Sequence, residues 1–377
     1  MRDFMLETHF SKWEFKAKYH MTASDSESMS LPELLAMASA EDVEKFHNLW
    51  LGYTETWGAA DLREEIAQTY DTLSAKHILC FAGAEEGVYA AMRVILKEKD
   101  HAIVVVPNYQ AAETIPLDIC EVSGVPLHEA SNWYLDMNEV AAAIRPNTKL
   151  ISINFPNNPT GAIISKENYA ALIALCRKHD LYLFSDEVYR LMETDETKRI
   201  AQAADVYEKG ISLNVCSKAY GFPGLRIGWI GCQDLDLLLK LEKYKHYLSI
   251  CNSAPSERLA LIALKNKAVI IEKNRALVKA NLAQLDAFFS RYPELFEWHT
   301  PDGGCVAYPK FLGKGGVENF CHRLVEEAGV LLLPSSIYHS ELLKAPENRF
   351  RIGFGRKDID VGLKVMQDFI DENRHNL

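Results

Sequence analysis

Short apolar runs alternate with helical patterns through the middle of this 377-residue chain, and this alternation restricts the fold more than any other feature. We expect strands at 77–83, 101–107, 149–156, 181–187, 211–217 and 226–232, with helices at 84–98 and, N-capped by Ser165, at 165–179. Strands that are rich in β-branched residues and lack polar alternation are buried on both faces. The pattern therefore predicts an α/β fold with a mostly parallel sheet between two layers of helices, a three-layer αβα domain.

The last hundred residues follow a different pattern. Apolar runs occur at 305–311, 330–336 and 349–355, and helical patterns occur at 317–329 and 358–372. These elements predict a smaller α+β domain. We therefore expect a large cofactor-binding domain over 41–275, with 276–377 and the N-terminal residues 1–40 forming the small domain and its arm.

Charge and composition exclude several classes of function. The formal net charge is −11 and the chain has no basic face, so binding to nucleic acid or to an anionic membrane is not expected. No apolar run approaches the roughly 20 residues of a membrane span, and the first twenty residues do not resemble a signal peptide. The eight cysteines are scattered without CxxC or metal-ligand spacing. We expect a cytoplasmic protein with reduced thiols and no metal.

The residues that follow each predicted strand are the candidates for chemistry, because open α/β sheets bind ligands beyond the carboxyl ends of their strands. After the first strand, Gly83, Ala84 and Glu85 lead into a helix. Small residues at a helix N-terminus expose backbone N–H groups, and with the helix dipole these favour a phosphate. An ordinary strand-to-helix turn is the alternative.

The next four predicted strands also end at polar or aromatic residues. Tyr109 follows the second strand, as either a core aromatic or a platform for a flat ring. The third strand ends in NFPNNPTG, where two prolines and a glycine fix the backbone around Asn158. The fourth ends in SDEVY, with Asp186 and Tyr189, and an Asp at the edge of an apolar run needs a cationic or hydrogen-bonding partner. The fifth is followed by Lys218.

Together these residues place an anion cradle, a ring platform, a carboxylate, polar donors and a lysine at one edge of the sheet. Pyridoxal 5′-phosphate requires this set of groups. The amine of Lys218 would form a Schiff base with the aldehyde of the cofactor. Asp186 would keep the pyridine nitrogen protonated, so that the ring can accept electrons. Arg226, eight residues after the lysine, would reach the phosphate.

The motifs NNPTG, SDEVY and SKAYGFPGLRIGW, in this order, resemble those of the class I/II aminotransferases, which are fold-type I pyridoxal-phosphate enzymes. The resemblance covers most of the chain. It implies that Lys218 carries the cofactor and that Asp186 pairs with the pyridine nitrogen. It also implies that Tyr189 and Asn158 bond the ring oxygen and that Tyr109 stacks on the ring.

The resemblance also assigns phosphate and substrate contacts. The backbone at Ala84 and Glu85, together with Arg226, would hold the phosphate. Tyr53, in LGYTETW, matches a tyrosine that reaches the phosphate of the partner subunit's cofactor, which implies a homodimer with a shared active site. Arg351, in FRIGFGR, matches the arginine that binds the substrate α-carboxylate in a bidentate fork.

One position departs from the family pattern. Many members carry a phosphate-binding serine three residues before the lysine, where this chain has Val215. Ser217, which is next to the lysine, would partly replace that contact.

The function implied by the resemblance is a pyridoxal-phosphate-dependent aminotransferase that acts on an L-amino acid and a 2-oxo acid. Lys218, Asp186 and Tyr189 would be catalytic, with the lysine amine as base and proton shuttle. The same cofactor residues support oxidation or hydroxylation, cyclisation, elimination or racemisation of an amino acid, so these reactions are alternatives. A DNA-binding regulator built on this fold is not expected, because the chain has no basic face and no room for a helix-turn-helix module.

The N-terminal arm contains the one clue to the substrate. In the family this segment passes over the active site, and here it holds Glu14, Asp25 and, as the lesser candidate, Glu27. The segment is similar to that of the branch that forms capreomycidine or oxidises arginine, where acids face a guanidinium. A cationic, arginine-like substrate is one interpretation, and a solvated charged arm is the other.

Overall fold

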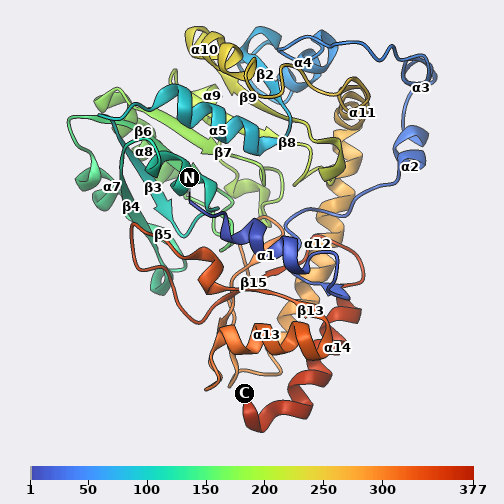
Figure 1. Cartoon of the computed structure of the whole chain (residues 1–377), viewed down its shortest axis with the longest axis vertical. Helices are drawn as coiled ribbons and strands as arrows, with labels where there is room; N and C mark the ends of the chain where they lie inside the picture. Colours follow the sequence, from blue (N-terminus) through green and yellow to red (C-terminus); the bar gives the residue numbers. More distant parts are fainter. Residues whose placement is uncertain (1) are drawn as a thin grey trace.

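An eight-stranded sheet lies at the centre of the larger part of the computed structural model, which describes residues 2–377 (Figure 1). Across the sheet its strands are β2 (Ile78–Phe81), β9 (Gly228–Cys232), β8 (Gly210–Val215), β7 (Tyr182–Asp186), β6 (Thr148–Asn154), β3 (His101–Val106), β4 (Glu121–His128) and β5 (Tyr134–Leu135). β4, β3, β6, β7 and β8 are parallel neighbours, whereas β9 is antiparallel to β8 and β2, and β5 is antiparallel to β4. The prediction of a mostly parallel sheet is confirmed.

Helices cover both faces of this sheet, as the three-layer prediction requires. One face is covered by α5 (Ala84–Ile95), α6 (Ala111–Leu117) and α10 (Leu235–Lys245), and the other by α7 (Met137–Ala143) and α8 (Lys166–His179). Both layers bury apolar side chains against strands whose residues are buried on both faces, which stabilises the sheet at its centre. The hydroxyl of Ser165 accepts a hydrogen bond from the Asn168 N–H and caps α8 as predicted.

All six predicted strands of this sheet are present, but two others were not predicted. β4 has the sequence EVSGVPLH, and its first four residues are at least partly exposed. Gly124 and Pro126 argue against a strand interior, because glycine weakens a strand and proline removes a donor. The short β5 lies beside β4 at the edge of the sheet. A proline such as Pro126 of β4 is tolerated near a sheet edge.

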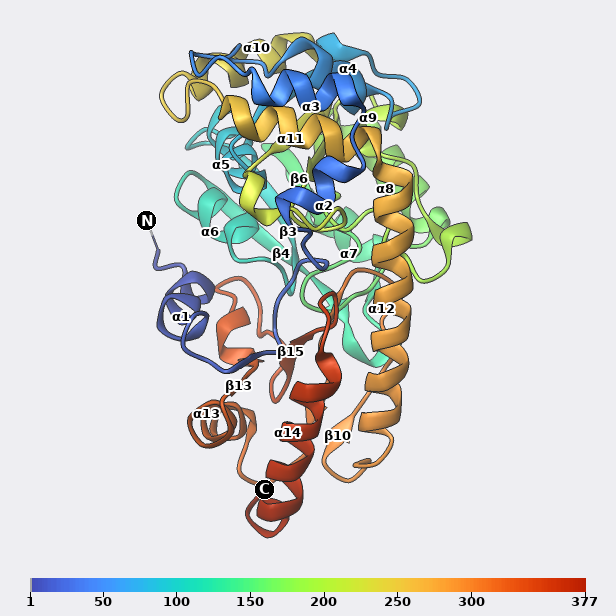
Figure 2. The ribbon, with the colours of Figure 1, turned by 90° about the vertical axis from the view of Figure 1, so that its right-hand side faces the viewer.

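The remaining helices of the larger part lie mainly on the side shown in Figure 2. They are α2 (Leu31–Ala36), α3 (Ala40–His47), α4 (Ala60–Ala67), α9 (Ala203–Val206) and α11 (Ala254–Lys265). The short η4 (Pro223–Leu225) separates β8 from β9.

The smaller part is α+β, as expected, and consists of short strands and two helices. Its strands are β10 (Phe296–Glu297), β11 (Val306–Ala307), β12 (Lys310–Phe311), β13 (Val330–Leu331), β14 (Leu333–Pro334) and β15 (Phe350–Gly353), and its helices are α13 (Val317–Ala328) and α14 (Ile359–Asn373). The single strands expected at 305–311 and 330–336 are each two short strands. An aromatic cluster that includes Phe289, Phe296 and Phe320 forms the core of this part.

The long helix α12 (Lys267–Phe289) runs continuously from the larger part to the smaller one (Figure 2). Its C-terminal residues Phe288 and Phe289 belong to the aromatic cluster. The boundary that we expect at 275 falls inside this helix, so one continuous element joins the two parts. The division into 41–275 and the remainder stays a proposal.

The N-terminal arm packs against the backbone of the smaller part. It contains the helix α1 (Met5–Trp13), which was not predicted, and β1 (Tyr19–His20), which pairs with β13. At Gly353 a β-carbon would lie 1.9 Å from the Ala23 carbonyl oxygen, and at Gly355 one would lie 2.2 Å from that of Asp25. The two glycines of the GFG sequence therefore permit the close approach of the arm.

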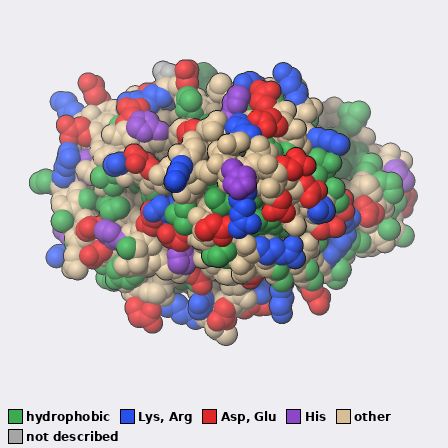
Figure 3. All heavy atoms as spheres, turned by 90° about the horizontal axis from the view of Figure 1, so that it is seen from below, with side chains coloured by type: hydrophobic (Ala, Val, Ile, Leu, Met, Phe, Trp, Pro, Cys, Tyr) green, Lys and Arg blue, Asp and Glu red, His purple; other side chains and the backbone are tan. Residues whose placement is uncertain are grey.

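Two surface properties and the thiols bear on function. On the face seen in Figure 3, acidic and basic side chains are interspersed and form no basic patch. Within residues 2–377, no helix is both long and apolar enough to cross a membrane. The eight cysteines form no disulfide.

Candidate active site

A cavity of about 540 Å³ lies where the carboxyl ends of β6, β7 and β8 meet the arm and the smaller part. Twelve of the predicted site residues line it: Glu14, Asp25, Ala84, Glu85, Tyr109, Asn158, Asp186, Tyr189, Ser217, Lys218, Arg226 and Arg351. Tyr53, Gly83 and Glu27 do not line it. Tyr53 is 86% exposed on the surface of the single chain, so any contact with a cofactor would have to be in another subunit.

Lys218 and Asp186 lie in the interior of this cavity. The Lys218 ammonium is 2.7 Å from the Ser24 hydroxyl, and burial lowers the pKa of this lysine, while the nearby carboxylates of Asp25 and Asp186 oppose the shift. Burial raises the pKa of Asp186 to about 6, although its Oδ1 accepts a hydrogen bond from the Val188 N–H. Both groups are therefore electrostatically destabilised in their charged forms, as is common at functional sites.

One end of the cavity is suited to a phosphate. Gly83 precedes α5 with φ 92°, and a β-carbon there would lie 2.3 Å from the Arg226 guanidinium, so the guanidinium lies directly over the first turn of the helix. Arg226 donates to the Pro223 carbonyl oxygen at 3.3 Å, and no carboxylate of the described chain forms an ion pair with it. The hydroxyl of Ser217 is buried without a hydrogen-bond partner. A helix N-terminus, an unpaired arginine and an unused hydroxyl are the groups that a phosphate would satisfy.

The other end is suited to a carboxylate. Arg351, on β15, is 1% exposed, and its guanidinium donates to the Thr22 hydroxyl and carbonyl oxygens and to Asn158 Oδ1, at 3.2, 2.7 and 3.3 Å. Within residues 2–377 no carboxylate forms an ion pair with it. A buried guanidinium without a counter-charge is costly, so this end of the cavity favours a bound anion.

The loop NFPNNPTG holds Asn158 in place through its neighbours. Asn154 accepts a hydrogen bond from the Asn158 N–H at 2.8 Å, and the Asn157 side chain accepts from the N–H and hydroxyl of Thr160. These bonds fix the loop, and Asn158 is then available to Arg351 and to the Tyr338 hydroxyl. The constraint that the sequence predicted around Asn158 is therefore present.

The two predicted tyrosines contact the N-terminal arm. The Tyr189 hydroxyl donates to the Ser24 carbonyl oxygen at 2.9 Å, and the Tyr109 hydroxyl donates to the Glu7 carboxylate at 3.4 Å. Tyr109 also packs edge-on against Phe4. Both rings line the cavity, and their hydroxyls are bonded to the arm.

The acidic residues of the arm differ in their partners. Asp25 is buried and accepts two hydrogen bonds from the Arg356 guanidinium, at 3.0 and 2.9 Å. It is therefore not the unpaired carboxylate that the sequence argument for a cationic substrate required. Glu27 accepts from the Lys357 N–H and lies outside the cavity. Glu14 lines the cavity, with His20 at 3.8 Å as its only ion-pair partner in the described chain.

Two further carboxylates, Glu7 and Glu85, face the same cavity without an arginine or lysine partner among residues 2–377. Burial, then Glu7, then Asp186 raise the pKa of Glu85 to about 7. Burial and Glu7 also raise the pKa of Glu14. We call Glu7, Glu14 and Glu85 the acidic wall. The exposed Glu7 repels both Glu14 and Glu85, which are partly desolvated, so the wall favours a positively charged group.

Several residues of this site were missed by the sequence analysis. Glu7 lies in a helix that was not predicted, and Ser24 and Thr22 belong to an arm segment without a distinctive pattern. Glu85 was assigned only a backbone contact. Tyr338 follows an apolar run in the smaller part and gave no signal of its own.

Comparisons with known proteins agree with this geometry. The profile of the family described as aminotransferase class I and II matches residues 25–363. The capreomycidine synthase of Streptomyces vinaceus is 24% identical over 96% of this chain and 92% of its own length. The arginine–pyruvate transaminase of Pseudomonas aeruginosa is 32% identical over 47% of each chain. The crystal structure of a PLP-dependent aminotransferase from Streptococcus suis is 29% identical, has a TM-score of 0.91 and covers 98% of each chain.

The fold, the two anion sites and the buried lysine thus define a pyridoxal-phosphate-dependent enzyme of fold type I. The chain belongs to the aminotransferase class I and II family, whose profile spans most of it. The unpaired Ser217 hydroxyl and the Gly83–Arg226 cradle fit the phosphate of this cofactor.

Proposed function

We propose that this enzyme is an aminotransferase that moves the α-amino group of an L-amino acid to a 2-oxo acid. The observation that supports it most is the Arg351 guanidinium, which is buried without a carboxylate partner in the cavity that also contains Lys218. Both an amino acid and a 2-oxo acid carry a carboxylate that can bind there in a two-pronged manner. One anion site therefore serves both half-reactions.

The residues of the chain have separable roles in this proposal. The bound cofactor supplies an electron sink when the α-carbon of the substrate loses its proton. The Lys218 amine takes that proton and returns it, and its lowered pKa favours the neutral amine that a base requires. Asp186 offers a buried carboxylate to the pyridine nitrogen, and a cation beside it would relieve the cost of its burial. Arg226, Ser217 and the start of α5 hold the phosphate.

An isotope-transfer experiment tests amino transfer. Holoenzyme is incubated with ¹⁵N-labelled L-amino acids and unlabelled pyruvate or 2-oxoglutarate, and products are analysed by mass spectrometry. We expect the label in newly formed alanine or glutamate. Label released as ammonia would instead indicate oxidation or elimination. Label retained in a cyclised product would indicate cyclisation, and the relatives of this chain include a capreomycidine synthase.

We also propose that the side chain of the amino acid is cationic, as in arginine. The acidic wall supports this, because an apolar or acidic side chain would leave three carboxylates without a counter-charge. A guanidinium can donate hydrogen bonds to two of these carboxylates at once through its fork of N–H groups. Asp25 is omitted from this proposal because Arg356 already neutralises it.

The substrate proposal is tested with Glu7→Gln and Glu14→Gln, assayed with arginine, ornithine, aspartate and alanine. Each loses one charge-assisted contact, so the KM for arginine should rise roughly tenfold while the value for alanine stays within about twofold. Glu27→Gln is the matched control, because Glu27 lies on the same arm outside the cavity. Aspartate as the best substrate, with all variants unchanged, would contradict a cationic substrate.

We propose a homodimer in which Tyr53 contacts the cofactor of the partner subunit. Large apolar side chains are exposed at Trp50, Leu51 and Tyr53 and again at Tyr247 and Ile250, which are the surface expected of an interface. The Thr54 hydroxyl donates to the Asn252 carbonyl oxygen and joins the two segments. Sedimentation analysis should give twice the chain mass, and a monomer with full activity would exclude the shared site.

A further inference from the structure

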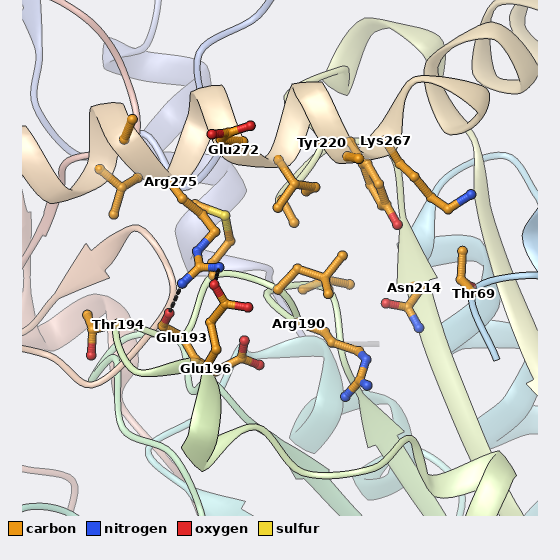
Figure 4. A pocket seen from close by; sticks show the side chains of 18 of the residues that line it. Thr69, Arg190, Glu193, Thr194, Glu196, Asn214, Tyr220, Lys267, Glu272 and Arg275 are labelled. Atoms are coloured by element: carbon orange, nitrogen blue, oxygen red, sulfur yellow. Dashed lines mark hydrogen bonds and ion pairs between the residues drawn. The ribbon is translucent and has the colours of Figure 1, made fainter. Parts of the chain in front are cut away.

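A second, larger cavity of about 880 Å³ lies between α12 and the segment 188–194 that follows β7 (Figure 4). Val188 lines both this cavity and the catalytic one, and Ala219, the residue after Lys218, is part of its wall. The volume is within the range of small-molecule sites in proteins. We call it the interdomain cavity.

The middle of the interdomain cavity is apolar. α12 contributes Ile271, Val278 and Leu282, which lie on one face of the helix at helical spacing. Leu191 and Met192 lie on the opposite wall. These side chains would bury the hydrocarbon body of a ligand and remove its apolar surface from water.

The charges around this apolar middle are matched, with one interior exception. Glu193 pairs with Arg199 at 2.7 Å, and Glu196 pairs with Arg275 at the end of the cavity where the dashed lines are drawn in Figure 4. Lys267 pairs with Glu65. The exposed Glu272 and Lys279 are at the rim.

Arg190 is the exception. It is partly buried and donates to the Ile200 carbonyl oxygen, but no carboxylate among residues 2–377 forms an ion pair with it. Its charge also acts on the buried carboxylate of Glu187, but a guanidinium without a direct ion pair on the wall of a partly enclosed cavity still favours an anion.

A tyrosine hydroxyl on the lining of the same cavity points to the same chemistry. Tyr220 as a whole is 6% exposed, and within the described chain its hydroxyl donates no hydrogen bond to the protein. Figure 4 shows this hydroxyl directed into the cavity, on the side where Asn214 and Thr69 lie. The tyrosine hydroxyl can donate to an acceptor on a ligand.

We propose that the interdomain cavity binds an amphipathic organic acid, with its carboxylate near Arg190 and Tyr220 and its apolar body along α12. The site is separate from the catalytic cavity, and the residues that bind the cofactor take no part in it. A fatty acid and an aromatic acid share this chemistry.

The walls of the cavity are bonded to the smaller part and to the segment that carries Lys218. The Thr194 N–H and hydroxyl donate to the Asp302 carbonyl oxygen, and the Gly304 N–H donates to that of Met192, so one wall is bonded to the smaller part. On α12, the Asn274 side chain donates to the carbonyl oxygen of Ala219. A ligand between these walls would therefore contact elements that are bonded to both the smaller part and the segment that carries Lys218.

Calorimetric titration of the holoenzyme tests the proposal. Decanoate and indole-3-acetate represent the aliphatic and aromatic acids, and decanol is the neutral control for the charge. We expect saturable binding of at least one acid, about tenfold weaker in Arg190→Gln, with weak decanol binding that the substitution leaves unchanged. Arg190→Lys should recover part of the loss, which a purely structural role would not predict.

A matched pair on α12 places the binding in this cavity. Ala276 lines the cavity and is exposed, so Ala276→Trp fills it without overpacking the core, whereas Ala280 is exposed on the same helix outside it. Ala276→Trp should abolish binding and Ala280→Trp should not. Binding of neither acid to the wild type, or equal binding by all four variants, would overturn the proposal. Whichever of the two acids binds more tightly shows whether the cavity prefers an aliphatic or an aromatic ligand.

Discussion

At the scale of single residues, the site depends on two arginines that the chain leaves without carboxylate partners. Arg226 lies over the start of α5, and Arg351 lies at the other end of the cavity. Lys218 and Asp186 lie between these ends, where burial opposes their charged forms. Both cations need an anion from outside the chain, and we propose that the phosphate of the cofactor and the carboxylate of the substrate supply it.

Removing Arg351 should affect every substrate alike, since all amino acids share the α-carboxylate. Arg351→Ala should lower kcat/KM roughly a hundredfold or more for each amino acid tested. This factor corresponds to a loss of about 3 kcal/mol in transition-state stabilisation. Arg351→Lys keeps the charge but loses the fork, so it should recover only part of this. A loss confined to arginine as substrate would show that Arg351 contacts the side chain instead.

Asp186→Asn should separate cofactor binding from chemistry. The amide retains the shape of the side chain and leaves the phosphate contacts intact, so cofactor should still bind. It cannot hold the pyridine nitrogen protonated, so kcat should fall by roughly two orders of magnitude or more, with a smaller change in KM. Absorbance of the bound cofactor and steady-state kinetics measure the two effects, and near-normal kcat would refute the role of Asp186.

At the scale of elements, the N-terminal arm completes the site by lying against glycine backbone. Gly353→Ala would place a carbon 1.9 Å from the Ala23 carbonyl oxygen, and backbone cannot give way as a flexible side chain can. The arm should detach, with faster proteolysis within 14–27 and a higher KM. Gly224→Ala is the control, because nothing lies within 4 Å of the added carbon there. Cleavage at the wild-type rate in Gly353→Ala would contradict this account of arm packing.

The sequence predicted the sheet and the residues at its edge because these obey local rules. Continuous apolar runs identified all six of the predicted strands, and the segments after them supplied Asp186, Asn158 and Lys218. Contacts made across long sequence separations could not be predicted in this way. For example, the sequence did not indicate that Asp25 pairs with Arg356, which is 331 residues away. The interdomain cavity depends on how α12 crosses between the two parts, which no local pattern specifies.

At the scale of the whole molecule, buried carboxylates make stability depend on pH. Burial raises the pKa of Glu187 to about 7, although the Ala203 N–H and the Ser212 hydroxyl donate to it. The folded chain keeps this proton where the unfolded chain releases it, above about 4.5, so stability falls as the pH rises from 4.5 to 7. The stability that is lost through Glu187 reaches about 3 kcal/mol above pH 7.

Glu187→Gln should remove this part of the pH dependence. The amide oxygen can still accept both hydrogen bonds, but the side chain no longer titrates. Urea unfolding of the wild type and of Glu187→Gln at pH 5 and pH 8 gives the free energy of unfolding of each protein at each pH. Asp186 and Glu85 are present in both proteins, so their titration affects both equally. The wild type should lose more stability than the variant between these values, and parallel losses would show that Glu187 does not titrate in this range.

We propose that Lys218 holds the cofactor between the two anion sites. Holoenzyme is reduced with borohydride, digested, and searched by mass spectrometry for a lysine that carries a pyridoxyl group. We predict complete labelling at Lys218, lost in Lys218→Ala but kept in Lys245→Ala, which removes another buried lysine. Label on any other lysine, or no label in cofactor-saturated protein, would contradict the assignment of this cavity as the active site.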